Sequence, residues 1–203
     1  MSESLPAWLT AGYLLPLVVV VLLLAGLLLV YRRRRRASRS LAKLFSTIAF
    51  DRIENLVVPN VDEGEIQIDH LLLTANGLLI VDVKEVTGTV FGSDKMQDWT
   101  VINSERRFTF ANPQPALFDR IAAVREIVRQ VPVAGRILFT DGAEFTKGVP
   151  SLVCKAAELL AEFRETDKAA AKAKIEAFKP HWELLRGHVS PSRSGRFTRY
   201  RRT

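Results

Sequence analysis

Two aspartates and a lysine, Asp69, Asp82 and Lys84, stand in a stretch of chain that is otherwise rich in Leu, Ile and Val. Carboxylates and an ammonium group are costly to bury among such side chains unless they pair with each other or bind a metal ion. Two Asp side chains suit Mg²⁺, which takes one or two carboxylates together with waters and substrate phosphates. A lysine beside them could orient an attacking water or neutralise charge on a phosphate. These three residues are the candidate chemistry of the chain.

A β-hairpin would bring the three side chains together. Apolar runs at residues 65–74 and 78–86 flank Asn76-Gly77. Asn-Gly between such runs is a strong hairpin signal, since a two-residue turn of this kind needs positive φ at both positions. The sequence therefore predicts a hairpin in which Ala75 faces Leu78.

In that register Asp69 lies opposite Lys84, and Asp82 is the diagonal neighbour of Asp69. Because side chains alternate across a strand, all three project from one face, and Glu65 and Gln67 continue that face as accessory candidates. The geometry alone allows two interpretations. One is a cross-strand ion pair between Asp69 and Lys84, with Asp82 partly exposed; the other is a Mg²⁺ site.

Around these residues the sequence resembles the nuclease-related domain family known as NERD. The resemblance covers about residues 40–150 and rests on ordered motifs: Ile-Asp-His at 68–70, the Asn-Gly turn, Asp-x-Lys at 82–84, and then Gly88, Gly92, Trp99 and Asn112-Pro113. The family is placed in the PD-(D/E)XK nuclease superfamily. The resemblance thus implies an α/β fold with a restriction-endonuclease-like mixed sheet and flanking helices.

The resemblance also implies roles for the three residues. Asp69 and Asp82 would bind a divalent cation such as Mg²⁺, and Lys84 would be the catalytic residue that assists hydrolysis of a phosphodiester bond in DNA or RNA. Two positions depart from the family pattern. The segment at residues 40–49 has no Glu where the family places one on its first helix, and Ala116 stands where the family tends to have Gln, with Gln114 as a partial substitute. An alternative function follows: an impaired nuclease-like domain that binds nucleic acid or protein.

The N-terminal region has the features of a transmembrane anchor. No charged residue lies between Glu3 and Arg32, and residues 14–30 are all apolar, Gly or Pro. A helix needs about 20 largely apolar residues to cross a bilayer. A cleaved signal peptide would instead have a basic leader and a small-residue cleavage site. The sequence therefore predicts a single-pass anchor over residues 1–31.

The five arginines at residues 32–36 predict the orientation of this anchor. Lys and Arg beside a span stay on the cytoplasmic side. We therefore expect an inner-membrane or plasma-membrane protein with its N-terminus outside and its C-terminal domain in the cytoplasm. The same arginines are candidates to bind anionic lipid.

The excess positive charge of the chain lies in two short segments. Lys and Arg number 29 against 22 Asp and Glu, a net charge of +7. Residues 32–36 and the tail at 188–203 contribute five arginines each and no acidic residue, so the rest of the chain carries a net −3. The nuclease interpretation therefore cannot rest on overall charge. A third alternative, a structural membrane protein whose tail contacts lipid headgroups, uses the same tail.

The remaining pattern predicts five segments: the anchor at 1–31, a basic linker at 32–39, the NERD-like domain at 40–150, C-terminal helices at 151–187 and a disordered tail at 188–203. Helices are expected at 40–49, 115–130, 152–163 and 167–186, the last with Thr166 as N-cap. Further strands are expected at 53–59, 88–92, 99–102, 107–110 and 136–140, and a polar turn at 60–64. Four other residues are expected to be structural: Cys154 on a helix face, His70, Trp99 and Phe110.

Overall fold

The computed structural model describes residues 7–59 and 64–192, without the side chains of residues 7–15, 17, 33, 34, 37 and 168. Most of the polar turn expected at 60–64 and most of the expected tail lie outside the described residues. The chain divides into two compact units, residues 1–43 and residues 44–203. Each is described by itself.

The first unit consists of helix α1 (Ala7–Ile48), whose last turn belongs to the second unit. Helix α1 runs without a break through the predicted linker at 32–39 and the helix expected at 40–49, so that this second helix is present but is not separate. Residues 31–48 contain neither Gly nor Pro and are rich in Arg, Ala and Leu, which favour an uninterrupted helix. Among the described residues, no helix combines the length and the apolar character needed to cross a membrane.

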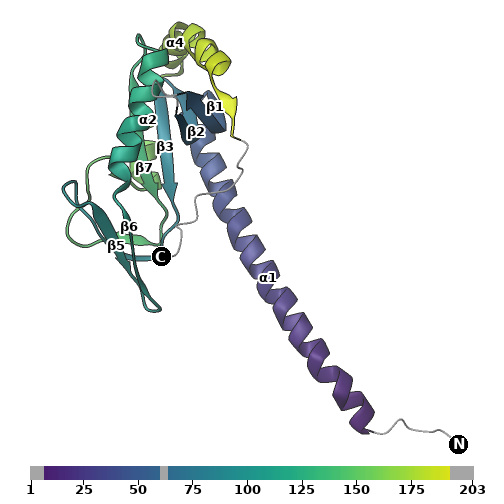
Figure 1. The fold of residues 1–203 in the computed structure, drawn as a ribbon. Helices are drawn as coiled ribbons and strands as arrows, with labels where there is room; N and C mark the ends of the chain where they lie inside the picture. Colours follow the sequence, from purple (N-terminus) through teal and green to yellow (C-terminus); the bar gives the residue numbers. More distant parts are fainter. Residues whose placement is uncertain (1–6, 60–63, 193–203) are drawn as a thin grey trace, which may run out of the picture. The chain divides into compact units, whose positions relative to one another are not determined.

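The second unit contains two mixed β-sheets (Figure 1). The larger has the order β10-β1-β2-β3-β7-β9; its neighbours from β10 to β3 are antiparallel, and β3, β7 and β9 are parallel. Its strands are β1 (Asp51–Pro59), β2 (Glu65–Thr74), β3 (Gly77–Lys84), β7 (Val133–Phe139), β9 (Val153–Cys154) and β10 (Ser190–Pro191).

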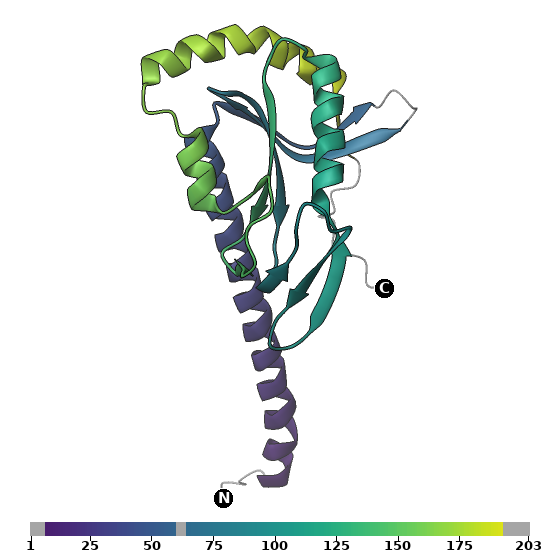
Figure 2. The same cartoon turned by 90° about the vertical axis from the view of Figure 1, so that its left-hand side faces the viewer.

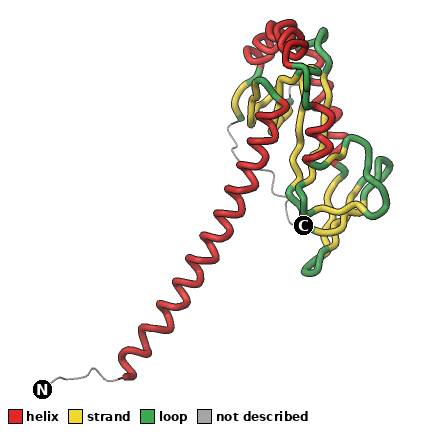
Figure 3. The backbone as a smooth tube through the Cα atoms, turned by 180° about the vertical axis from the view of Figure 1, so that it is seen from behind, coloured by secondary structure: helices red, strands yellow, loops and turns green. Residues whose placement is uncertain are grey.

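The smaller sheet has the order β6-β5-β4-β8, with β4 and β8 parallel and the other neighbours antiparallel. Its strands are β4 (Gly88–Phe91), β5 (Asp98–Ile102), β6 (Arg107–Ala111) and β8 (Ala143–Phe145). Figure 3 shows the strands in yellow and the loops that join the two sheets in green. The predicted mixed α/β architecture is confirmed at this level.

Helices α2 (Pro113–Ile127), α3 (Ala156–Phe163) and α4 (Lys168–His188) complete the second unit (Figure 2). Leu71 of β2 and Ile80 of β3 form one buried core with Leu117 and Ile121 of α2. Gly135 of β7 allows this close approach, because a Cβ there would lie 2.8 Å from the ends of both α2 side chains. The alternation of side chains thus gives β2 and β3 one face beneath α2.

Two predicted helix features are wrong in detail. The segment predicted as a helix at 152–163 begins with strand β9, so Cys154 lies on a strand, and α3 starts only at Ala156. Val153 and Cys154 pair with Ile137 and Leu138 of β7, a contact that the local pattern does not encode. The N-cap of α4 is Asp167 and not Thr166, since its carboxylate accepts hydrogen bonds from the amides of residues 169 and 170. The other predicted strands and helices of this unit lie within three residues of the observed bounds.

Candidate functional site

The β2–β3 hairpin has a different register from the predicted one. Thr74 pairs with Gly77 and His70 with Val81, so the turn residues are Ala75 and Asn76. Gly77 has a positive φ (112°), whereas Asn76, which the structure also describes, does not. Gly77 is drawn into the strand because its backbone packs against Pro132, whose carbonyl accepts a hydrogen bond from the Leu78 amide at 2.8 Å. The predicted pairing of Ala75 with Leu78 is therefore wrong.

The observed register moves the cross-strand partners of β2 and β3 by two residues relative to the predicted register. Continued by one step beyond the His70–Val81 pair, the observed register sets Asp69 opposite Asp82, where the sequence had predicted Lys84. Asp82 and Lys84, two residues apart on β3, project from one face, whereas the β2–β3 pairs end at His70–Val81 and leave Asp69 one residue beyond the ladder. This face lies beneath α2, apolar toward the turn and polar at the far end.

Asp82 is the centre of the polar end. Its side chain is only 5% exposed, and both of its oxygens have a cationic partner. Lys84 Nζ lies 2.7 Å from Oδ1, and Arg120 Nη1 of α2 lies 3.3 Å from Oδ2. A buried carboxylate requires such partners. The interpretation in which Asp82 is partly exposed is therefore wrong.

Arg120 is the residue of this site that sequence reasoning missed. Its Nε donates a hydrogen bond of 2.8 Å to the carbonyl of Gln67, just beyond the last β2–β3 pair, while Nη1 reaches Asp82. Helical spacing could have placed it on the flank of α2, since it follows the buried Leu117 by three positions. The carboxylate that it meets depends on how α2 crosses the sheet, and no local pattern reports that.

The contacts of the three accessory candidates, Gln114, Gln67 and Glu65, indicate mostly structural roles. Gln114 is 4% exposed, and its Nε2 donates to Asp94 Oδ1 (2.8 Å) and to the carbonyl (2.6 Å) and hydroxyl (3.0 Å) oxygens of Ser151. The hydrogen bond from Gln114 lowers the pKa of the Asp94 carboxyl. Together the three bonds connect the loops that carry Asp94 and Ser151 to the start of α2. Gln67 contributes its backbone carbonyl to Arg120, and Glu65 is exposed at the start of β2.

The residues expected to be structural are confirmed as such. The His70 ring packs against the ring of Phe45, with centroids 5.0 Å apart, and burial lowers its pKa. Burial raises the pKa of the Cys154 thiol to about 12. Trp99 and Phe110 are buried with ring centroids 6.1 Å apart. None of these four belongs to the polar end of the hairpin.

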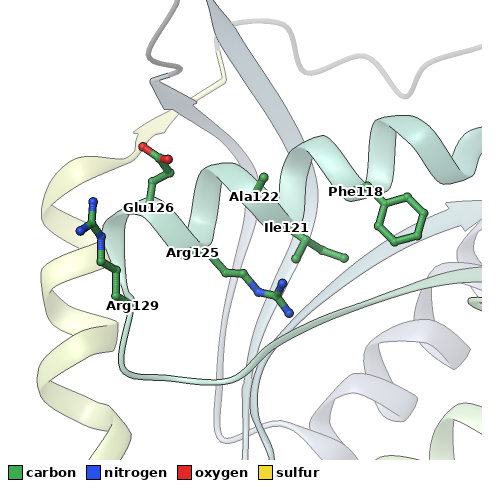
Figure 4. A pocket seen from close by; sticks show the side chains of 6 residues that line it. All are labelled: Phe118, Ile121, Ala122, Arg125, Glu126 and Arg129. Atoms are coloured by element: carbon green, nitrogen blue, oxygen red, sulfur yellow. The ribbon is translucent and has the colours of Figure 1, made fainter.

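An open groove of about 420 Å³ lies beside Arg120. Its walls come from the start of β2 and from α2: Ile66, Gln67, Ala116, Asp119, Arg120, Ala122, Ala123 and Glu126. A second hollow, shown in Figure 4, follows another side of α2 from Phe118 to Arg129 and contains neither Asp82 nor Lys84. Neither hollow is lined by Asp69, Asp82 or Lys84, and of the residues that contact Asp82 only Arg120 lines the first groove.

The residues present fit a divalent cation that needs few protein ligands. Within the described residues, no group of three or more His, Cys, Asp or Glu side chains is placed to hold a metal ion. Asp82 supplies one buried carboxylate, and Asp69, one residue beyond the last β2–β3 pair, is the candidate for a second; two carboxylates suit Mg²⁺ with waters and a substrate phosphate. Lys84 and Arg120 already neutralise Asp82, so a cation there would share its carboxylate with them.

Comparison with known proteins identifies the family of the chain. The family model for the nuclease-related domain, NERD, matches residues 30–140, more than half of the chain. The chain belongs to the NERD family. The match includes the whole β2–β3 hairpin and Arg120 of α2. The chain is also 30% identical over 64 residues to an uncharacterized protein of Bacillus anthracis, a region that covers 32% of this chain and 30% of that protein. No solved structure matches the chain.

Proposed function

We propose that this NERD domain hydrolyses phosphodiester bonds of DNA or RNA with a divalent cation. The observation that carries the proposal is the pairing of the buried Asp82 carboxylate with Lys84 Nζ at 2.7 Å, two residues along one strand. The mixed sheet, with the antiparallel β2–β3 hairpin beside the parallel pair β3–β7, supports a restriction-endonuclease-like core.

Each residue has a separate part in this chemistry. Asp69 and Asp82 would hold the cation, which when bound supplies Lewis-acid polarisation of the phosphate. Lys84, held by Asp82, presents an ammonium group that can orient a water or stabilise the negative charge that develops on phosphate oxygens. Because both residues are on strand β3, the backbone holds Lys84 and Asp82 at a fixed spacing.

The test is cleavage of labelled single- and double-stranded DNA and RNA by the full purified chain, with and without Mg²⁺. We expect Mg²⁺-dependent cleavage that falls at least about 100-fold in Lys84→Met, the scale seen when one charge-stabilising group is removed. Asp82→Asn should have the same effect, and Asp98→Asn, an exposed residue of the small sheet, should have none.

Asp82→Asn also leaves two cations without their carboxylate, a change that typically costs about 3–5 kcal/mol of stability. Its thermal unfolding must therefore be measured beside its activity, and Lys84→Met serves as the second variant. Cleavage that persists in both folded variants would sink the proposal.

A second candidate function, binding without turnover, is favoured by Arg120. Its guanidinium contacts Asp82, and the family Glu and Gln positions are not filled. In this case the full chain would bind DNA or RNA in a salt-dependent manner without cleaving it. Complete loss of binding on deletion of residues 193–202 would assign it to the basic tail. No binding at low salt would leave a protein partner.

We also propose that the N-terminal segment anchors the protein in the inner or plasma membrane. The support is the charge-free sequence between Glu3 and Arg32 and the exposure of the described apolar side chains of α1, such as Leu22, Leu23 and Leu27 at 65–68%. A run of such side chains is unfavourable in water. The arginines at 32–36 favour a cytoplasmic NERD domain and contacts with anionic lipid headgroups.

A further inference from the structure

The Arg120 guanidinium contacts the Asp82 carboxylate at an oxygen that a bound metal ion would also use. Asp82 offers two oxygens: Lys84 takes Oδ1 and Arg120 takes Oδ2. The Arg120 contact, at 3.3 Å, is the longer of the two. The carboxylate is 5% exposed, so little water screens the charges around it.

We propose that Arg120 is a built-in counter-cation that competes with the divalent cation for Asp82, so that metal binding displaces its guanidinium from Oδ2. The inference rests on the proposed function, since it concerns the same carboxylate. Arg120 is on this view a positioning residue: its guanidinium holds the buried carboxylate in place until the metal ion enters.

The physical reason is repulsion at short range. A divalent cation on Asp82 would lie within a few ångströms of both the ammonium group and the guanidinium, and such like charges repel strongly in a poorly screened site. Lys84 is on the same strand as Asp82, so its position is fixed by the sheet. Arg120 comes from α2, has a long side chain and is 22% exposed, which makes it the partner able to move.

The groove beside Arg120 offers the displaced guanidinium a place to go. Asp119 and Glu126 are exposed and line the same groove as Arg120. Their carboxylates can accept hydrogen bonds from a guanidinium that leaves Oδ2. The displaced guanidinium would thus enter a groove whose exposed carboxylates favour a positive charge.

The experiment measures Mn²⁺ binding to the full purified chain by the loss of the free-ion EPR signal. We expect Arg120→Gln to tighten binding at least tenfold relative to the unaltered chain. Arg120→Lys, which keeps the positive charge, should change it less than threefold. Arg125→Gln is the matched control, because Arg125 is on the same helix and also donates to a backbone carbonyl, that of Val133. It should leave the affinity unchanged.

A second measurement needs no stable variant at position 120. In the ¹⁵N-labelled chain, Mg²⁺ should shift the Nε–H signal of Arg120, whose Nε is bonded to the Gln67 carbonyl, and leave that of Arg125 in place. An unmoved Arg120 signal at saturating Mg²⁺ would overturn the inference. So would an Arg120→Gln chain that is folded and binds Mn²⁺ no more tightly.

The same titrations separate this inference from the proposed function. If Asp82→Asn abolishes Mn²⁺ binding while Arg120→Gln has no effect, the metal site stands and only the competition is refuted. If folded Asp82→Asn binds Mn²⁺ as the unaltered chain does, Asp82 is not a ligand, and both the metal site and the competition are refuted.

Discussion

The thiol of Cys154 is chemically silent in the folded protein. The side chain is buried on β9, and burial raises its pKa from 9.0 to about 12. Only the thiolate reacts with alkylating reagents, and at pH 8 a pKa of about 12 leaves roughly one molecule in ten thousand ionised. We expect no reaction with iodoacetamide or a disulfide reagent between pH 7 and 9 in the native state and full reaction in guanidinium chloride. Rapid native labelling at pH 8 would contradict this.

The same residue scale shows what a sequence can disclose about a site. That Asp82 and Lys84 share a face was predictable, because side chains two residues apart on a strand point the same way whatever the register. The partner that neutralises Asp82 was not, since Arg120 lies 38 positions away and meets it only after α2 has packed on the sheet. Local patterns encode which way a side chain points; they do not encode what it meets.

At the scale of elements, the turn at Gly77 holds the hairpin that carries the site. Gly77 has a φ of 112°, and a Cβ there would lie 2.3 Å from the Pro132 carbonyl oxygen. Gly77→Ala should therefore lower the free energy of unfolding by at least about 2 kcal/mol, since the backbone conformation alone costs about 1–3 kcal/mol.

Chemical denaturation followed by circular dichroism measures this change. The control is Gly187→Ala in α4, where a Cβ meets nothing within 4 Å and the helix should gain up to about 1 kcal/mol. Equal stability of the two variants would show that the turn does not constrain the hairpin.

Element boundaries also show where sequence patterns stop being informative. Strand β2 has its predicted bounds, because an apolar run between turn signals is a local property. Strand β9 was predicted as part of a helix, since its two residues become a strand only by pairing with Ile137 and Leu138 of β7. The helix α1 was predicted in pieces, because a change from apolar to charged residues indicates a change of environment and not the end of a helix.

At the scale of the whole molecule, charge and apolar surface are separated along the chain. The residues outside 32–36 and 188–203 carry a net −3, so this part of the chain does not attract nucleic acid by its overall charge. Positive charge is concentrated next to the apolar segment and in the tail. This distribution favours a protein held at a membrane, with nucleic-acid attraction supplied by the tail if it occurs.

Labelling of single introduced cysteines tests this arrangement in intact cells. The chain suits the experiment because its one natural thiol, Cys154, is buried and unreactive. In Ser2→Cys the new thiol should react with a membrane-impermeant maleimide added outside, since the N-terminus is expected there. In Ser194→Cys it should react only after lysis, because the arginines at 32–36 keep the following chain in the cytoplasm.

Deletion of residues 1–31 provides the matched control for the anchor itself. The full chain should sediment with membranes and resist extraction by carbonate, whereas the shortened chain should lose this resistance, because one apolar span inserts almost irreversibly and electrostatic contacts do not. Any membrane binding left to the shortened chain should disappear in high salt, as expected for arginines on anionic headgroups. A full chain that carbonate releases, or Ser194→Cys labelled in intact cells, would refute the anchor or its orientation and leave the chemistry of Asp82 and Lys84 untouched.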